Sequence, residues 1–381
     1  TTLCHSSSFN ILFLATMNGE LFAYNTDGFG DGLGKGPIWK SYFGQPVLQI
    51  CCYESTIFIL HPFSVSVGQI NTGSAEPPCF EISGEVKQLS SVNQCIYQMM
   101  KMSEITNTLI IATSNGRLTM YNLPDLNIYD EINLEHKIQT FDMMLNYLVV
   151  STNNRENEIF DTSCRKFIHL KKQSSGFKYP ITTAIKILNS TTDMNDLPHD
   201  LIFAQAGLEG KVSIVTTTIE SQTEPTVTLN TAARSAPISS SVTNPSGIYI
   251  PHDEKKFIFR AHRSTLSDNN ILVGPIYSLS MVNGYLVTSG YGGDNKQGGK
   301  VEGSVCFWDI NHKRRVKLCR GFPHSVVQTC SWNTESGKSI LVCGCSDDSF
   351  KNMPVPAESS SFVHTVPPSS IVVMVLGERK W

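Results

Sequence analysis

A short unit of apolar and polar positions recurs along the chain. Each copy has an apolar strand, a tight turn that contains glycine, and a second strand that alternates and ends in an aromatic residue. The first copy spans Leu12–Asn25, and Leu109–Asn122 repeats it almost position for position. An Asn-Gly pair stands at both turns and supplies the positive φ angles that a two-residue hairpin turn requires. The pattern therefore predicts a series of β-hairpins.

Five further copies follow the same pattern less closely, at Thr56–Asn71, Tyr147–Asp161, Leu201–Val215, Tyr285–Ile310 and Ser339–Leu376. A second kind of short strand precedes the later hairpins, at Val47–Tyr53, Val86–Leu89, Ile138–Met143, Ile181–Leu188, Ile276–Met281 and Val326–Trp332. One such strand plus one hairpin gives most of a four-stranded blade, and blades of this kind stack around a common axis. The clearest hairpin ends in Trp308-Asp309, the pair that marks a WD40 blade.

We therefore predict an all-β fold, a single seven-bladed WD40-type β-propeller over residues 1–381. We expect its ring to close by pairing Ser370–Leu376 with the first blade, because an unpaired sheet edge is a liability. Two segments interrupt the rhythm. Residues 216–251 are rich in Ser, Thr and Pro and predict a flexible loop within the propeller, and residues 352–368 predict a proline-containing loop in the last blade.

Composition excludes several function classes. With 381 residues, 17% charged positions and a net charge of -3, the chain has no global field that would attract DNA, RNA or anionic lipid, so any anion recognition must be local. The apolar runs are shorter than the roughly 20 residues of a membrane-spanning helix, and we expect no membrane segment. Eleven cysteines without metal-knuckle spacing favour buried thiols in a reducing compartment. The chain opens on Thr1, which we interpret as a truncated or processed end.

No motif for catalysis stands out. No Gly-x-Ser-x-Gly elbow accompanies the histidines, and no cluster has EF-hand spacing. We expect a non-catalytic binding platform without metal or cofactor.

Cations near the fifth hairpin are the most pointed feature of the sequence. Lys211 follows a Leu-Glu-Gly turn, and Arg260, His262 and Arg263 come after the Ser/Thr/Pro-rich segment. If that segment loops out, these cations converge on neighbouring strands of blades five and six, where they suit a phosphate or a carboxylate. The alternative is an ordinary blade surface with solvated charges. The basic stretch His312–Lys317 is expected to be a solvated hairpin, with nucleic-acid binding as the alternative.

The same region resembles a known family. The segments Leu208–Ile214, Phe257–Arg263, Pro275–Leu279 and Gly303–Asp309 resemble consecutive motifs of the Bub/Rae propellers, a group of spindle-checkpoint and mRNA-export proteins. Ser346–Lys351 and Gly176–Tyr179 are more similar to the fungal checkpoint members. The resemblance extends from about Gly176 to the end and is limited to the blade pattern before that.

This resemblance implies a nuclear kinetochore adaptor of the spindle assembly checkpoint. Such adaptors bind a GLEBS peptide of checkpoint scaffold kinases across one face and dock onto phosphorylated MELT repeats of a kinetochore scaffold. The alternative within the family is an mRNA-export propeller that acts with nucleoporins and RNA. A strongly basic rim would favour RNA, whereas an isolated cationic pair would favour a phosphopeptide.

The family's functional residues carry over unevenly. Its phosphothreonine-binding cations fall on Lys211 and Arg260, although lysine lacks the bidentate fork of arginine. Its peptide-binding surface falls on Met17, Ser114 and Thr182, where the family has Trp, Trp and Arg. Either the partner peptide has changed with these positions, or the chain is a divergent paralogue with another client.

Overall fold

The computed structural model of the protein describes residues 2–27, 29, 36–71, 79–87, 96–103, 105–190, 199–219, 256–265, 271–294, 301–334, 337–346 and 369–376. No α-helix occurs in these ranges, and none of their elements is a helix that could span a membrane.

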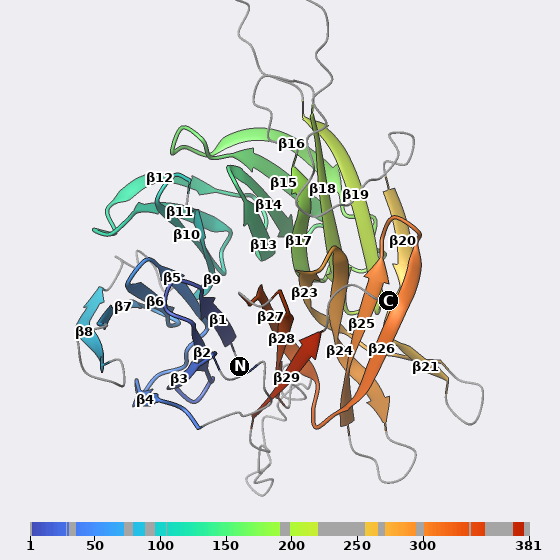
Figure 1. Ribbon diagram of the computed structural model, residues 1–381. Helices are drawn as coiled ribbons and strands as arrows, with labels where there is room; N and C mark the ends of the chain where they lie inside the picture. The colour runs from blue at the N-terminus through green and yellow to red at the C-terminus, as the bar shows by residue number, and fades with distance from the viewer. Residues whose placement is uncertain are drawn as a thin grey trace, which may run out of the picture.

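Seven antiparallel sheets form the blades of a propeller, which confirms the predicted fold (Figure 1). Blades one to three consist of β1 (Thr2–Ser6), β2 (Ile11–Ala15), β3 (Glu20–Asn25) and β4 (Trp39–Tyr42); β5 (Gln49–Tyr53), β6 (Thr56–Leu60), β7 (Val65–Asn71) and β8 (Cys79–Lys87); and β9 (Tyr97–Ser103), β10 (Thr108–Thr113), β11 (Arg117–Asn122) and β12 (Ile128–Asn133).

The remaining blades follow in chain order. Blades four to six consist of β13 (Ile138–Met144), β14 (Tyr147–Thr152), β15 (Glu156–Asp161) and β16 (Ile168–Ser174); β17 (Thr182–Ser190), β18 (His199–Gly207), β19 (Lys211–Ile219) and β20 (Lys256–Arg260); and β23 (Ile276–Val282), β24 (Tyr285–Asp294), β25 (Val301–Asp309) and β26 (Arg314–Phe322). Blade seven has β27 (Val326–Asn333), β28 (Ser339–Cys345) and β29 (Ser370–Leu376), and a small hairpin, β21 (Arg263–Thr265) with β22 (Ile271–Val273), stands between blades five and six.

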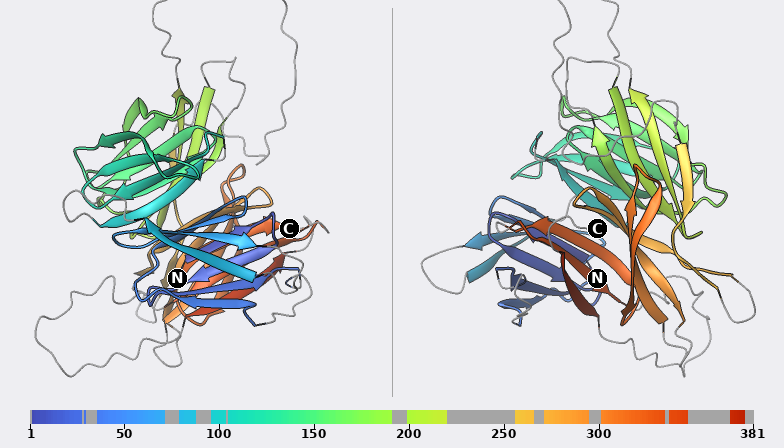
Figure 2. Two further views of the ribbon diagram at one scale, coloured as in Figure 1. Left: turned by 90° about the vertical axis from the view of Figure 1, so that its left-hand side faces the viewer. Right: turned by 45° about the vertical axis from the view of Figure 1, so that its right-hand side comes forward.

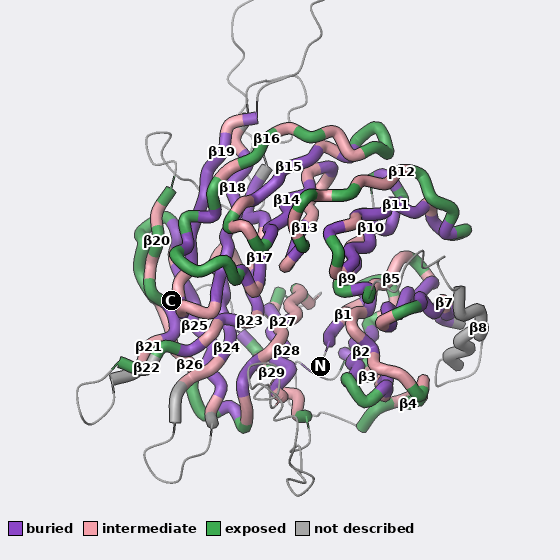
Figure 3. Tube along the Cα trace, turned by 180° about the vertical axis from the view of Figure 1, so that it is seen from behind, coloured by how far each residue is buried: buried purple, intermediate pink, exposed green. Residues whose placement is uncertain are grey.

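The core is divided among the interfaces between neighbouring blades. Side chains alternate between the two faces of each strand, so each sheet packs against the blade before it and the blade after it. Seven apolar clusters result, one at each interface around the ring. Buried residues concentrate in the inner strands of the blades, while the residues of outer strands such as β4, β12 and β16 are exposed or intermediate (Figure 3). Figure 2 shows the blades from two further directions.

Neighbouring inner strands are also joined by polar side chains that reach the next blade. Gln49 of β5 accepts a hydrogen bond from the Met100 amide of β9 at 2.9 Å, and Gln139 of β13 accepts one from the Thr182 amide of β17 at 2.8 Å. These contacts satisfy backbone groups that the blade's own ladder leaves unpaired, as buried amides require.

The ring closes differently from the expectation. Ser370–Leu376 does not pair with the first blade, because β29 pairs with β28 and β1 already supplies the inner strand of blade one. Blades seven and one instead meet face to face. The Gln328 side-chain amide accepts from Leu3 N at 3.1 Å and donates to Leu3 O at 3.2 Å, and the His5 ring stacks on Trp332 at 4.0 Å. Closure therefore rests on side chains rather than on a shared sheet.

Three smaller expectations are corrected or untested. Val86–Leu89 is not an inner strand, because Val86 lies in β8, the outer strand of blade two, and β9 is the inner strand of blade three. Thr216–Ile219, placed in the flexible loop, continue β19, where they pair with β18. The rest of that segment and the 352–368 loop lie outside the described residues.

The cysteines whose side chains the structure describes are free thiols, and every one of these except Cys164 lies in a strand.

Candidate functional site

Lys211 and Arg260 are cross-strand neighbours at one end of blade five. Lys211 is the first residue of β19 and Arg260 the last of β20, and their Cα positions pair directly in the ladder. The expected convergence thus occurs for Lys211 and Arg260, but within blade five rather than between blades five and six, whereas His262 is buried and Arg263 lies in β21. Directly opposed residues of an antiparallel pair have Cβ atoms about 4.5–5.5 Å apart, so both cations can reach one ligand.

The turn before Lys211 requires a glycine. Gly210 has φ +62°, and a Cβ atom at this position would lie 2.8 Å from His262 O and 2.9 Å from Gly274 O. The backbone of the connection between blades five and six therefore approaches the turn more closely than any side chain allows. This contact fixes the position of Lys211 relative to the chain that follows Arg260, because the Ala261 amide donates to Gly210 O at 2.8 Å.

Glu209 already balances the charge of Lys211. The Lys211 ammonium forms an ion pair with Glu209 Oε2, and the Tyr179 amide donates to Glu209 Oε1 at 3.0 Å. Burial alone would raise the pKa of Glu209, but the bond from Lys211 and the Tyr179 amide outweigh it and hold the pKa below its usual range. Arg260 is exposed and forms no ion pair within the described part of the chain. The site thus offers one unshared guanidinium group and one ammonium group shared with Glu209.

The three positions of the expected peptide surface lie at the same end of the ring as Lys211. Thr2, Tyr97 and Thr182 begin inner strands and pair beside the turns that follow β2, β10 and β18, so these turns all lie at the end where inner strands begin. Met17 and Ser114 belong to two of these turns.

Their environments differ. Met17 is 39% exposed, whereas Thr182 is buried and donates its amide to Gln139. Ser114 is half-buried, and its amide donates to Ile96 O at 2.9 Å. The structure thus places the three positions on one face but in separate blades, and only Met17 presents a large exposed apolar side chain.

His262 is a buried structural histidine. Its Nε2 lies 3.0 Å from the Thr288 hydroxyl, which also accepts the Trp308 indole N–H at 3.0 Å. Its Nδ1 lies 2.9 Å from Ser304 Oγ and 3.2 Å from Tyr291 O. Burial lowers the pKa of His262 to about 4, so the ring is neutral near pH 7.

The Ser304–His262 contact therefore differs from a nucleophile–base pair. A hydroxyl rather than a carboxylate meets the second ring nitrogen, and both residues are 3% exposed. The contact holds the connection after β20 against blade six.

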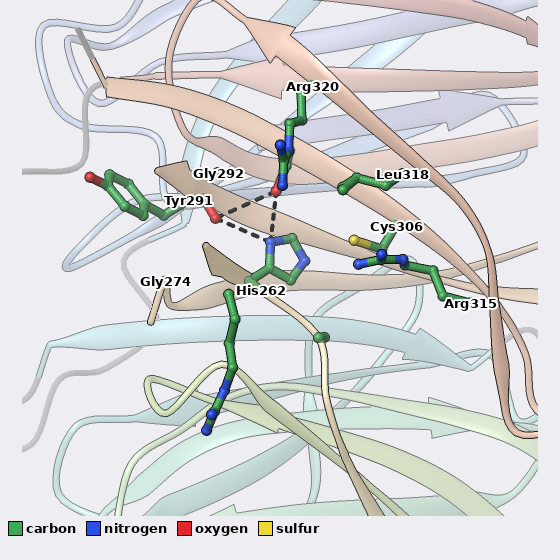
Figure 4. Close-up of a pocket in the computed structure, with 11 residues that line it drawn as sticks. His262, Gly274, Tyr291, Gly292, Cys306, Arg315, Leu318 and Arg320 are labelled. Carbon is green, nitrogen blue, oxygen red and sulfur yellow. Dashed lines mark hydrogen bonds between the residues drawn. The ribbon is translucent and has the colours of Figure 1, made fainter. Parts of the chain in front are cut away.

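A pocket beside His262 was not found from the sequence. It is small, with a cavity volume of about 10 Å³, and is lined by the connection after β20 and by three strands of blade six (Figure 4). Arg315 and Arg320 of β26 lie near the imidazole ring, with Cys306 and Leu318 alongside. The basic stretch His312–Lys317 contains Arg315, one of the pocket residues. The other pocket residues, such as Arg320 and Arg263, come together with Arg315 only in the folded chain.

No group of three or more His, Cys, Asp or Glu side chains in the described ranges is placed to hold a metal ion.

Comparison with known proteins shows the class. No protein-family model and no curated protein matches the chain. Among solved structures, the WD40 β-propeller domain of Doa1 superposes with a TM-score of 0.51 at 8% identity, covering 89% of this chain and 88% of that one. The chain therefore has the WD40 β-propeller fold, which generally serves as a scaffold for protein interactions rather than as a catalyst. At this identity the likeness shows the fold alone.

Proposed function

We propose that this propeller is a kinetochore adaptor of the spindle assembly checkpoint, which binds a phosphorylated threonine of MELT-type repeats through Lys211 and Arg260. The observation that supports the proposal is the direct cross-strand pairing of these two cations at the rim of blade five. A dianionic phosphate accepts several charge-assisted hydrogen bonds, and a guanidinium beside an ammonium suits it well. In this role the protein acts in the nucleus, at the kinetochore.

Glu209 gives the proposed site an internal competitor. Its carboxylate occupies the Lys211 ammonium in the absence of ligand, so an incoming phosphate has to displace it or share the lysine with it. Two anions near one lysine repel each other. Glu209 therefore weakens the affinity of the site for phosphate.

A titration with a MELT-type peptide, with and without phosphate on its threonine, tests the proposal. We expect selective binding of the phosphorylated form, a loss of about tenfold or more with Lys211→Ala or Arg260→Ala, and a gain with Glu209→Gln. Lys40→Ala is the matched control, because Lys40 forms an equivalent ion pair with Glu20 in blade one at 2.8 Å. Equal weakening of both peptides by Lys211→Ala would contradict the role.

The second partner of the proposal is a GLEBS-type peptide of checkpoint scaffold kinases, bound over the face that holds Met17, Ser114 and Thr182. Because these positions lack the family's two tryptophans and its arginine, we propose that contact in this region relies on the exposed Met17 side chain. Isothermal titration of the propeller with a GLEBS peptide, compared with a Met17→Ser variant, tests this partner.

One observation favours an alternative, an mRNA-export propeller that acts with nucleoporins and RNA. Cations extend beyond the proposed pair along β26, which carries Arg314, Arg315, Lys317 and Arg320. Binding of single-stranded RNA with a strong salt dependence, together with no response to the phosphorylated peptide, would favour this alternative over the adaptor.

A further inference from the structure

The outer strand of blade six is a long, cationic sheet edge. β26 runs over nine residues and stands last in its sheet, so no described strand pairs with its outer side. It contains four Lys or Arg residues and no Asp or Glu, in a chain whose net charge is -3. An unpaired edge presents backbone donors and acceptors to solvent and can accept another strand.

The two faces of β26 differ in chemistry. Arg315 and Arg320 pair with Trp308 and Ser304 of β25, and with Leu318 they face blade five. Val316 and Cys319 face blade seven, where they pack against its apolar cluster, and Lys317 lies on the same side, opposite Phe307. A strand added to this edge would alternate in the same way, with one set of side chains beside the arginines and the other set beside Val316 and Cys319.

Within the described part of the chain, no acidic side chain forms an ion pair with the arginines on the blade-five side. The neutral polar groups of the pocket form hydrogen bonds with one another. The Thr288 hydroxyl accepts from the Trp308 indole N–H and can donate to His262 Nε2, and the His262 Nδ1–H donates to Tyr291 O.

Arg315 and Arg320 form no ion pair within the described residues. The Nε–H of Arg263, which also lines the pocket, is buried without an acceptor there. Figure 4 shows the two β26 guanidinium groups beside the His262 ring. The guanidinium groups of Arg315 and Arg320 thus remain available to an anion.

We propose that the β26 edge binds an extended acidic peptide strand whose carboxylate side chains alternate with apolar ones. The peptide backbone pairs with the open edge, its carboxylates contact Arg315 and Arg320 over the pocket, and its apolar side chains lie beside Val316 and Cys319. Guanidinium groups bind carboxylates through two parallel hydrogen bonds, which gives this register its specificity.

The same charges disfavour the pairing of this edge with a second copy of the chain. Two β26 strands side by side would oppose like charges, which destabilises the pair, whereas an acidic strand gains a favourable contact at each cation. The charges of β26 thus make its pairing with another β26 unfavourable and its pairing with an acidic strand favourable. The alternating apolar positions favour a peptide over a polynucleotide, since a phosphate backbone has no apolar side chains to place there.

This site is separate from the proposed phosphothreonine pair, because Lys211 and Arg260 belong to β19 and β20 of blade five. Failure of one proposal leaves the other intact. A Lys211→Ala variant should lose the phosphorylated MELT-type peptide and keep the acidic strand.

The probe is a fluorescent seven-residue peptide of alternating glutamate and valine, titrated against the full chain by anisotropy. We expect saturable binding that weakens about tenfold or more in Arg315→Glu/Arg320→Glu, as loss of two charge-assisted contacts implies. The matched control is Lys171→Glu/Lys172→Glu on β16, the outer strand of blade four, with an expected change of about twofold or less. Circular dichroism checks that both variants are folded.

Two further measurements separate strand pairing from charge attraction. A peptide N-methylated at alternate residues, on the amides that would face β26, should lose binding, and the β26 amides should become protected in hydrogen exchange when the unmodified peptide binds. Three results would each overturn the proposal. The methylated peptide could bind as tightly as the unmodified one, a peptide with contiguous glutamates could bind equally well, or Arg315 and Arg320 could prefer single-stranded RNA.

Discussion

Asp142 is a buried charge that joins three blades. We predict that replacing it with a neutral residue lowers the stability of the fold. The side chain is 2% exposed and lies on the inner strand of blade four. Lys101 Nζ of blade three lies 3.1 Å from Asp142 Oδ1, and Lys186 Nζ of blade five lies 3.2 Å from Oδ2. The Ile187 amide also donates to Oδ2 at 2.9 Å.

The magnitude follows from what Asp142→Asn removes. Removing one partner of a buried ion pair costs about 3–5 kcal/mol, because a buried charge remains uncompensated. Here the two lysine side chains are 34% and 29% exposed, so water screens part of their repulsion, and the asparagine oxygen can still accept from Ile187. We therefore expect the free energy of unfolding to fall by about 2–4 kcal/mol.

Urea unfolding followed by tryptophan fluorescence measures this loss, and a double-mutant cycle assigns it. Lys101→Met in the Asp142→Asn background should cost less than Lys101→Met alone, since the two changes share one interaction. A loss below about 1 kcal/mol, or additive costs in the cycle, would refute the argument that this carboxylate holds the three blades together.

The pH dependence of the Asp142 contribution has a definite sign. Burial would raise the pKa of the carboxyl, but Lys186, Lys101 and the Ile187 amide outweigh it and hold the pKa below its usual range. The carboxyl therefore binds fewer protons in the folded state. Its stabilisation is complete above the ordinary pKa of about 4 and is lost as pH falls through the lower folded value.

Three further predictions concern single side chains. Burial lowers the pKa of His262 from 6.5 to about 4, so between these pH values the unfolded chain binds one more proton than the folded chain. The free energy of unfolding should therefore fall by up to about 3 kcal/mol from pH 6.5 to pH 4. In a His262→Asn variant, the free energy of unfolding should depend less steeply on pH across this range. Gly210→Ala should lower the free energy of unfolding by about 2–3 kcal/mol, because the alanine Cβ would have a positive φ and lie too close to two carbonyl oxygens. Thermal unfolding measures this loss. Gly36→Ala is the control and should stay near wild type, because the space around its Cβ is open. Gln328→Ala should cost about 1–3 kcal/mol by leaving Leu3 N and O unpaired at the closure; hydrogen exchange at Leu3 that matches wild type would argue against this closure.

The sequence by itself determined the blades. Hairpins such as Leu12–Asn25 were recognisable because side-chain alternation and turn glycines are local properties, which any strand pair of this kind must satisfy. The juxtaposition of Lys211 and Arg260 was also within reach, since a long segment between two strands of one sheet can loop out without changing their register.

The tertiary structure decided what depends on contacts between blades. The prediction of ring closure was wrong. A strand pattern shows that a segment can pair, but it does not show which strand is its partner. In the structure β1 pairs within blade one and β29 pairs with β28. The Asp142 contacts and the pocket at Arg315 and Arg320 join residues that are many positions apart in the sequence. Such groups have no local pattern, because their partners are set only when sheets stack around the axis and bring distant side chains within hydrogen-bond distance.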